Sequence, residues 1–343
     1  MASTILYPNL STSSSAINKT ESISVQRTHV ILACCIGSMG VIGNIFVFIV
    51  LSSSSTLRKN RTNKLIMHQS IIDFLGSLFL ILTWTIDPDI QGNYAYCVIW
   101  VTKLHFWIFL ITSTYSLLLI TIERYLGVVY ESWYKNKVTD RHMIVCISIV
   151  WILIIGFTSA MAISTSAIGS DGSCMIYSYP SLSVKQGIGV LIFTVDFLLP
   201  IVVHIFCYIR IFRTLWIRNK NTVDAIYMVN EGDEDNLINN RKEMRNVVVT
   251  LITITICFVS CWFCNQLYLL LHHLDHQVDF TSDFYHFTVI AVFCNCAINP
   301  IVYALKYKQF QEHAKKVICS FRSDKTAERY EGKLDSGSTF LSQ

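Results

Sequence analysis

Two adjacent charged residues, Glu123 and Arg124, stand within an otherwise apolar run, residues 117–129. The chemistry that such a pair offers is electrostatic, because each side chain can bind the other or exchange it for a new partner. In a soluble protein the pair would lie on a solvated helix face. At the edge of a membrane, where water is near, the pair would cost little to hold and little to break, which suits a switch.

A second group of polar residues lies inside segments that are otherwise apolar. Ionisable side chains in such segments are costly and mark either a function or a buried pair. Asp73 is the carboxylate of the group, and its candidate partners are Asn44, Ser113, Asn295 and Asn299. If these side chains converge, Asp73 could bind a metal ion, Na⁺, or carry a proton. The alternative is a hydrogen-bonded packing cluster without an ion.

The composition predicts a membrane protein. Hydrophobic residues make up 52% of the 343 residues and charged residues only 15%, whereas soluble domains carry about a quarter charged residues. Residues 30–51 contain no charge, and as a helix they would be about 33 Å long, enough to cross a bilayer. Six more runs are long enough to span, at 65–86, 99–126, 143–166, 187–211, 246–271 and 284–305. We therefore predict an all-α membrane protein with seven spans.

The charges of the loops predict the orientation, because lysine and arginine are enriched on the cytoplasmic side. Basic residues gather after spans one, three, five and seven: Arg58, Lys59, Arg61, Lys64, Lys135, Lys137, Arg141, Arg213, Arg218, Lys220, Arg241, Lys242, Lys306, Lys308, Lys315 and Lys316. The alternate loops carry aspartates instead. We therefore expect the N-terminal tail, residues 1–28, outside the cell, where Asn9 and Asn18 lie in glycosylation sequons.

Most of the 12 cysteines lie inside the predicted spans, where cysteine behaves as a small hydrophobic residue. Only Cys97 and Cys174 fall in or beside the predicted extracellular segments. That compartment is oxidising. A disulfide that ties the loop after span four to the top of span three is therefore favoured over two free thiols.

The spans carry an ordered series of motifs. The residues are Gly43-Asn44, Asn63, Asp73, Glu123-Arg124-Tyr125, Trp151, Pro200, Tyr208, Phe258, Cys261-Trp262 and Asn299-Pro300-Ile301-Val302-Tyr303, followed by Phe310. With this set in this order, the chain resembles the rhodopsin-family (class A) G-protein-coupled receptors over nearly its whole length. The resemblance implies a seven-transmembrane helix bundle at 29–305, a short amphipathic eighth helix at 306–319 and a cytoplasmic tail at 320–343. It also implies a plasma-membrane receptor rather than an enzyme.

The resemblance assigns roles to both groups of polar residues. Arg124 would pair with Glu123 at rest and swing free on activation, to help form the crevice that receives a heterotrimeric G protein. The implied coupling switch comprises Glu123, Arg124, Tyr125, Tyr208, Asn299, Pro300 and Tyr303. Trp262 resembles the family's toggle, with Phe258 one turn below it. The implied allosteric sodium site comprises Asn44, Asp73, Ser113, Asn295 and Asn299, and no other cofactor is implied.

Four features depart from the family's pattern. Cys264 stands where a proline usually follows the span-six tryptophan, so this helix loses the usual cause of its kink. Cys97 lies two residues further from Arg124 than is typical, and a longer helix top or a bulge would absorb the difference. Met244 replaces the acid that locks Arg124 in many members. Span two reads His68–Ser70 where small and apolar residues are common.

The outer half of the bundle should bind the ligand. By family position, the lining residues are Trp84, Lys103, Phe106, Trp107, Asp196, Asn265, Gln266, His286 and Val289. Asp196 is the unusual feature, because it could receive a cationic group of the ligand or pair internally with Lys103 or a histidine. The acidic outer loops favour a basic or amidated peptide, as for a neuropeptide receptor. A non-peptide small molecule is the alternative.

Inside the cell, the segment after Tyr303 has apolar residues at helical spacing with lysines between them. This pattern predicts an amphipathic helix that lies on membrane lipid. Cys319 at its end is a candidate palmitoylation site. Serines and a threonine in the tail could be phosphorylated by a receptor kinase and then recruit arrestin.

Other functional classes fit the sequence less well. An intramembrane protease would need two carboxylates, and Asp73 and Asp196 are available, but neither follows Gly-x-Gly. A transporter or channel would show repeated halves or broken helices, and we find no internal repeat. A decoy receptor that binds a ligand without signalling is the closer alternative, because the departures affect span six. Nothing in the sequence indicates nucleic-acid binding.

Overall fold

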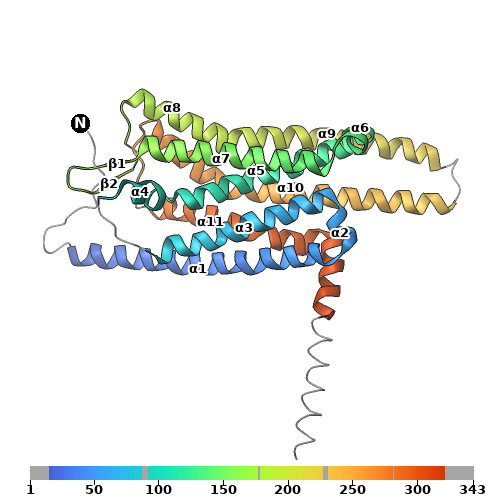
Figure 1. Cartoon of the computed structure of the whole chain (residues 1–343), viewed down its shortest axis with the longest axis horizontal. Coiled ribbons are helices and arrows are strands. Elements are labelled where there is room, and N and C mark those ends of the chain that lie inside the picture. Colours follow the sequence, from blue (N-terminus) through green and yellow to red (C-terminus); the bar gives the residue numbers. More distant parts are fainter. Residues whose placement is uncertain (1–14, 87–91, 177, 227–230, 281, 321–343) are drawn as a thin grey trace, which may run out of the picture.

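The structure is a computed structural model that describes residues 15–86, 92–176, 178–226, 231–280 and 282–320, without the side chains of 15–27, 29, 219–241 and 243. Its long helices lie side by side in one elongated bundle (Figure 1). Within the described residues, 7 helices are long and apolar enough to cross a membrane: Val30–Ser53, Arg61–Thr85, Leu104–Val129, Asp140–Thr165, Leu182–Arg218, Met244–His273 and Asp283–Lys306. The prediction of seven spans is confirmed.

The helices of the bundle follow in chain order. They are α1 (Ser15–Ser53), α3 (Arg61–Thr85), α5 (Leu104–Val129), α7 (Asp140–Thr165), α8 (Leu182–Phe193), α9 (Leu199–Ile226), α10 (Glu231–His273) and α11 (Asp283–Lys306). A π-helical turn, η2 (Thr194–Leu198), joins α8 to α9, so these form one span. The connections contain α2 (Ser55–Lys59), α4 (Tyr94–Tyr96), η1 (Cys97–Val101), α6 (Glu131–Lys137) and the antiparallel strands β1 (Ala167–Ile168) and β2 (Cys174–Met175).

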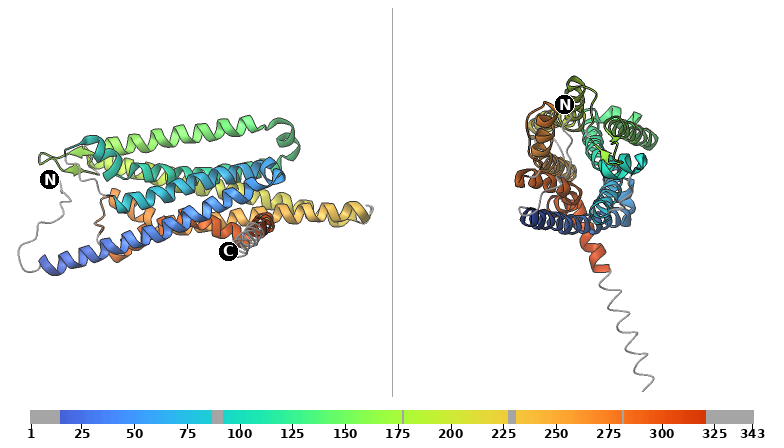
Figure 2. Two further views of the ribbon diagram at one scale, coloured as in Figure 1. Left: turned by 60° about the horizontal axis from the view of Figure 1, so that its bottom comes forward. Right: turned by 90° about the vertical axis from the view of Figure 1, so that its left-hand side faces the viewer.

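The helices form a closed ring, which Figure 2 shows end-on. Helix α1 contacts both α3 and α11, α3 contacts α5, α5 contacts α7 and α9, and α10 contacts α11. Gly43 permits the close packing of α1 on α11, because a Cβ there would lie 2.9 Å from the Cβ and Cγ atoms of Pro300. The core of the ring holds large aromatic side chains, among them Phe258, Trp262 and Tyr303.

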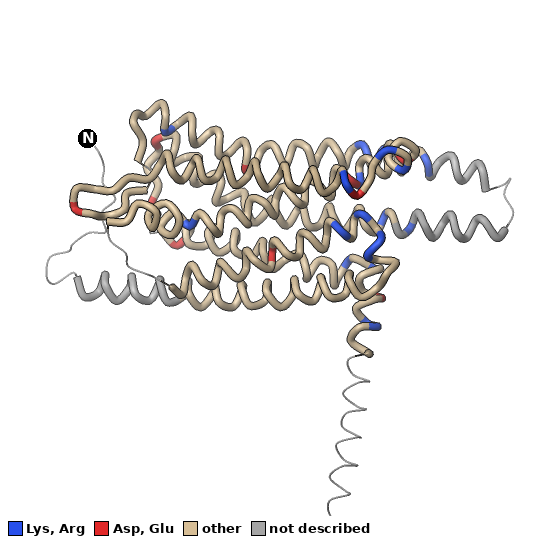
Figure 3. The backbone as a smooth tube through the Cα atoms, in the orientation of Figure 1, with Lys and Arg blue, Asp and Glu red and all other residues tan. Residues whose placement is uncertain are grey.

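Charged residues are distributed unevenly along the bundle. Figure 3 shows most lysines and arginines at the end that carries α2 and α6, with few charges along the middle of the bundle. A bilayer disfavours charge at its centre and attracts basic residues at its cytoplasmic face. The structure therefore places the predicted cytoplasmic loops together at one end.

The two additional residues between Cys97 and Arg124 are absorbed at the top of span three. The chain forms the π-helical turn η1 there. Lys103 then adopts a left-handed backbone conformation, with φ 58° and ψ 34°, before α5 begins at Leu104. Of the two alternatives, a longer helix top or a bulge, the structure shows the bulge, and the rest of α5 is a regular helix.

A further helix follows α11 and covers residues 308–320. Phe310 and Ala314 are buried against the bundle, and the Phe310 ring packs on Phe46 with centroids 6.0 Å apart. Lys315 and Lys316 are exposed. This face pattern confirms the short amphipathic eighth helix.

Candidate functional site

Four helices bring polar side chains together around Asp73, which is 1% exposed. Ser113 Oγ on α5 donates a hydrogen bond to Asp73 Oδ1 over 2.6 Å, and Asn299 Nδ2 on α11 donates to Oδ2 over 2.6 Å. Asn44 on α1 donates to the carbonyl oxygen of Cys296 over 3.0 Å. Asn295 is buried on α11. Ser113 and Asn299 thus bond to the Asp73 carboxylate, as predicted. Within the described residues, Asn44 and Asn295 are buried but make no hydrogen bond to Asp73.

Gln69 is a member of this cluster that the sequence analysis did not assign. Its Nε2 lies 3.2 and 3.1 Å from the two Asp73 carboxylate oxygens and 2.6 Å from Ser113 Oγ. Its position four residues before Asp73 on one helix was the available signal, because side chains at that spacing meet. Three buried oxygens of the cluster lack a hydrogen-bond partner: Asn44 Oδ1, Gln69 Oε1 and Asn299 Oδ1. Unpaired oxygens around a carboxylate are the groups that a cation would satisfy.

Glu123 and Arg124 form a two-pronged ion pair at the cytoplasmic end of α5. Arg124 Nε donates to Glu123 Oε2 and Nη2 donates to Oε1, each over 2.6 Å. Such bidentate pairs are the strong form of the arginine–carboxylate contact. The structure therefore holds Arg124 in the paired arrangement that we expected at rest.

Two residues from other elements also hold Glu123. Thr62 Oγ1 on α3 donates to Glu123 Oε2 over 2.9 Å, and the Tyr134 hydroxyl on α6 donates to Glu123 Oε1. Burial, followed by the charge of Glu123, raises the pKa of Tyr134 to about 12, so its hydroxyl keeps its proton at physiological pH. The sequence carried no signal for either contact, because both depend on how separate helices pack.

Of the three tyrosines assigned to the coupling switch, Tyr208 and Tyr303 share no hydrogen bond in this structure. The Tyr208 hydroxyl lies 3.1 Å from Thr121 Oγ1 and 2.9 Å from Thr255 Oγ1, which links α5, α9 and α10. The buried Tyr303 hydroxyl has no hydrogen-bond partner, and its ring packs near Tyr307, with centroids 6.3 Å apart. Tyr303 is therefore available for a contact that this arrangement does not make.

Aromatic rings connect the outer half of the bundle with its centre. Trp262 and Phe258 lie fully buried on α10, with ring centroids 5.7 Å apart. Trp107 on α5 lies 6.4 Å from Trp262, centroid to centroid. Helix α10 runs as a single element past Cys264, the position where the family usually has proline. The rings of Trp107, Trp262 and Phe258 thus form a continuous series of contacts from the outer half of the bundle to its centre.

Among the described residues, Asp196 pairs neither with Lys103 nor with a histidine, so this structure does not show the internal pair. Lys103 Nζ lies 4.0 Å from the centroid of the Trp84 ring, a cation–π contact. Asp196 is 6% exposed on η2, and its Oδ1 has no hydrogen-bond partner. No ion pair to Asp196 occurs among the described residues.

The other predicted lining residues surround this region. Phe106 packs on Trp107 and on Phe293, with centroids 5.7 and 5.8 Å apart. Asn265 Nδ2 donates to Thr288 Oγ1 over 3.2 Å, while Gln266 Oε1 is buried without a partner. His286 and Val289 lie on α11, where both are partly buried.

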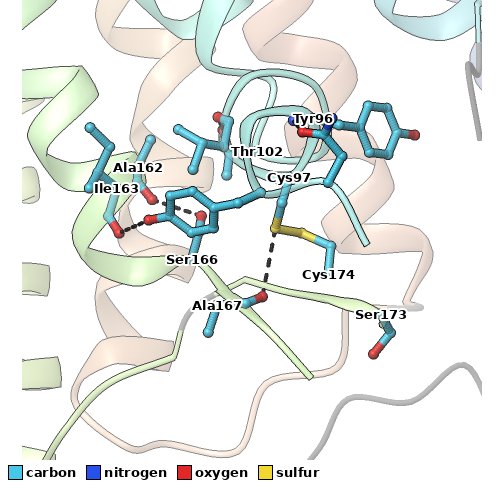
Figure 4. Close-up of a disulfide and its surroundings, with 12 residues drawn as sticks. Tyr96, Cys97, Thr102, Ala162, Ile163, Ser166, Ala167, Ser173 and Cys174 are labelled. Carbon is cyan, nitrogen blue, oxygen red and sulfur yellow. Dashed lines mark hydrogen bonds between the residues drawn. A yellow bond between two sulfur atoms is a disulfide. The ribbon is translucent and has the colours of Figure 1, made fainter. Parts of the chain in front are cut away.

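A disulfide joins Cys97 and Cys174, as predicted, with their Cα atoms 5.5 Å apart. Figure 4 shows it beside β1, where Cys97 Sγ lies 3.8 Å from the carbonyl oxygen of Ala167. The β1–β2 loop is thus tied to the top of span three.

An ion pair lies at the same end of the bundle. Lys185 Nζ lies 2.8 Å from Asp275 Oδ1, and this hydrogen bond lowers the pKa of the Asp275 carboxyl.

Removal of this disulfide is expected to lower stability. Replacing both Cys97 and Cys174 by serine should cost about 2–5 kcal/mol, because the bond restricts the unfolded chain. The detergent-solubilised variant should therefore unfold several degrees below the original chain in a thermal melt. Cys146→Ser is the matched control, since Cys146 is a free and exposed cysteine. Equal melting of the two variants would contradict the expectation.

The remaining predictions concern covalent modification. Asn9 lies outside the described residues, as does the side chain of Asn18. Cys319 is exposed near the end of the helix over 308–320. The tail beyond Ser320 also lies outside the described residues.

Residues 43–303 match the family described as 7 transmembrane receptor (rhodopsin family). Two curated relatives illustrate its range. The chain is 26% identical over 300 residues to galanin receptor 2a of Danio rerio, which covers 83% of this chain and 76% of the relative. It is 24% identical over 323 residues to adenosine receptor A2b of Gallus gallus, which covers 86% of this chain and 89% of the relative.

A solved structure shows the same architecture. The crystal structure of squid rhodopsin aligns with a TM-score of 0.70 at 18% identity, over 87% of this chain and 86% of that one. At that identity the match speaks for the fold, a seven-helix membrane bundle.

Proposed function

Because the chain belongs to the rhodopsin family of seven-transmembrane receptors, we propose that it binds an extracellular ligand, a peptide, and activates heterotrimeric G proteins. The observation that carries this proposal is the bidentate pair of Glu123 and Arg124 at the cytoplasmic end of the bundle. The pair holds the Arg124 cation near water, where it can be released to bind another partner. The protein forms no covalent bond with its ligand and is a receptor rather than an enzyme.

The proposed mechanism has two states of one helix bundle. Ligand binding in the outer half favours one packing of the rings around Trp262 and Phe258. The inner half of α10 then swings outward, and Arg124 leaves Glu123. Tyr208 and Tyr303, which the resting bundle keeps apart, come together near Arg124. The opened crevice receives a helix of the G protein and releases its GDP.

Asp73 and its neighbours are the proposed sodium site. Asp73 supplies the negative charge, Ser113 supplies a hydroxyl oxygen, and the unpaired amide oxygens of Asn44 and Asn299 complete a set of hard oxygen ligands. In the resting bundle, Asn299 donates a hydrogen bond to Asp73, and Asn299 directly precedes Pro300 in α11. A cation bound beside Asp73 would hold these groups in place and so favour the resting bundle. Asp73 thus connects α3 with α11, the helix that carries Tyr303.

Two features support a peptide ligand with a basic group. Galanin names the ligand of one relative, and the outer loops of this chain carry aspartates. The buried Asp196 has an unpaired oxygen, and a buried carboxylate is stable as an anion only beside a cation. A lysine, arginine or amine of the ligand would fill that role. A non-peptide ligand is the alternative that the adenosine receptor relative keeps open.

Asp196→Asn is expected to weaken activation by basic peptides about tenfold or more, because the ligand's cation would lose a buried partner. The measurement is the half-maximal concentration for G-protein activation by each active peptide and by its analogue with norleucine in place of the basic residue. The norleucine analogue should lose no further potency in the variant. Asp171→Asn is the control, since this exposed carboxylate accepts hydrogen bonds, among the described residues, from Ser173 alone. Equal potency on Asp196→Asn and the original chain would exclude a role for Asp196.

Several further assignments belong to the same proposal. The receptor lies in the plasma membrane with its N-terminus outside, where Asn9 and Asn18 carry glycans. Cys319 carries a palmitoyl chain that anchors the helix over 308–320 to lipid. A receptor kinase phosphorylates the tail, and arrestin binds the product. The basic loops gathered at one end of the bundle support this orientation.

The proposal is tested with membranes that contain the chain, a library of amidated peptides and a panel of Gα subunits. Uptake of a GTP analogue that depends on one peptide would support a signalling peptide receptor and identify its G protein. Silence across the panel, with the receptor present at the cell surface, would exclude the peptides tested. A ligand that binds without driving uptake would identify a decoy.

A further inference from the structure

We propose that Asn246 on α10 is an autoinhibitory clasp that holds the inner half of this helix against the junction of α11 with the helix over 308–320. The proposal rests on the function proposed above, in which α10 must move outward to admit a G protein. It assigns to Asn246 the restraint that an acid at position 244 would supply, where this chain has Met244.

The clasp consists of two hydrogen bonds from one side chain. Asn246 Nδ2 donates to the carbonyl oxygen of Lys306 over 2.7 Å, and the backbone N–H of Lys308 donates to Asn246 Oδ1 over 2.9 Å. The amide NH₂ of Asn246 therefore bonds to a backbone acceptor, and its amide oxygen bonds to a backbone donor. A side chain with only a donor or only an acceptor could not make both contacts.

The two backbone groups are ones that helices leave unsatisfied. Lys306 is the last residue of α11, and Lys308 begins the helix over 308–320. The last carbonyls and first N–H groups of helices lack partners within the helix. Asn246 supplies a partner to one group on each side of the junction, so the contact is built into the turn rather than incidental to packing.

Arg124 does not restrain α10 in this structure. Its hydrogen bonds in the described part of the chain go to Glu123, its neighbour on α5. The inner half of α10 is otherwise linked to other helices by the contact of Thr255 with Tyr208, and Val247, Val248 and Leu251 pack in the apolar core. Among the described residues, Asn246 makes the side-chain hydrogen bonds of α10 closest to its cytoplasmic end.

The position of the clasp suits a restraint that must be released. Asn246 is partly exposed, and both Lys306 and Lys308 are exposed, so water can replace each bond when α10 moves outward. Hydrogen bonds at such sites are weak enough to break and strong enough to bias an equilibrium of two states. Outward movement of α10 lengthens both bonds together, because both acceptor and donor lie on the far side of the interface.

The test compares Asn246→Ala with Thr253→Ala in membranes without ligand. Thr253 lies on the same helix, and in the described part of the chain its hydroxyl donates only to the Val249 carbonyl of that helix. We expect uptake of a GTP analogue to rise about fivefold for Asn246→Ala, the effect of losing two exposed hydrogen bonds, and to stay unchanged for Thr253→Ala. Asn246→Asp retains the acceptor and the size of the side chain but lacks the donor, so uptake should rise less in this variant than in Asn246→Ala. Asn246→Asp also replaces Asn246→Ala in the test if the alanine variant does not reach the cell surface.

A second measurement does not require a G protein. Fluorophores on non-natural residues that replace the exposed Lys137 and Lys242 report the separation of α6 from the inner end of α10. The separation should increase in Asn246→Ala without ligand. Unchanged separation and unchanged uptake would overturn the clasp, as would equal rises in Thr253→Ala. Increased separation in a protein that drives no uptake with any ligand would support the clasp and contradict the proposed function.

Discussion

Replacing Arg124 by alanine is expected to abolish ligand-dependent G-protein activation while leaving ligand binding nearly unchanged. The loss should be about a hundredfold in the rate of nucleotide exchange, because in the proposed mechanism the variant removes a charged group that contacts the G protein only in the open state. Ligand affinity should change little, since Arg124 lies near the cytoplasmic end of α5, whereas Trp84 lies in the last turn of α3 at the opposite end of the bundle. The measurement is exchange rate and ligand affinity on the same membranes.

Arg124→Ala also leaves Glu123 buried without its ion pair, so a control must exclude general damage. Lys135→Ala serves, because Lys135 is an exposed cation at the same end of the bundle, paired with Glu131 over 2.8 Å. Exposed pairs of this kind contribute little to stability. Retained exchange in Arg124→Ala, at the level of Lys135→Ala, would remove Arg124 from the mechanism.

Asp73→Asn is expected to abolish the effect of sodium on the receptor. In the original chain, replacing Na⁺ by a bulky organic cation should raise agonist affinity about tenfold, within the usual range for coupling between two sites. The variant should bind agonist equally with and without Na⁺, because the one carboxylate of the cluster has become a neutral amide. The measurement is agonist affinity in matched buffers of constant ionic strength.

Ser70→Ala is the control for Asp73→Asn. Ser70 is equally buried on α3, but its hydroxyl bonds to the Ile66 carbonyl and not to Asp73. This variant should keep the sodium effect of the original chain. If the agonist affinity of the original chain does not change with Na⁺, the other interpretation of the cluster is supported. In that interpretation the polar side chains pack by hydrogen bonds around a protonated or fully satisfied Asp73.

The sequence predicted the fold well because hydropathy and length decide where a chain crosses a bilayer. It predicted the ends of the spans less well. Helices α9 and α10 extend to Ile226 and from Glu231, well beyond the predicted limits at 211 and 246. Hydropathy marks where the membrane ends, whereas a helix continues as long as its backbone hydrogen bonds are satisfied.

The candidate site was predicted in part. The convergence of Asp73, Ser113 and Asn299 and the pairing of Glu123 with Arg124 followed from the motifs. The contacts of Tyr134 with Glu123 and of Asn246 with Lys306 did not. These contacts join residues far apart in the sequence, and their existence depends on the rotation and depth of each helix in the bundle, which no local pattern specifies.

In the proposed function, ligand binding makes this chain a catalyst of GDP release. This can be measured with purified receptor in lipid nanodiscs and a purified G protein, by following the release of labelled GDP on addition of a ligand that binds. We expect faster release with the original chain and no acceleration with Arg124→Ala. Release at the rate of the G protein alone, with the ligand bound to the original chain, would exclude G-protein activation and identify a receptor that binds without signalling.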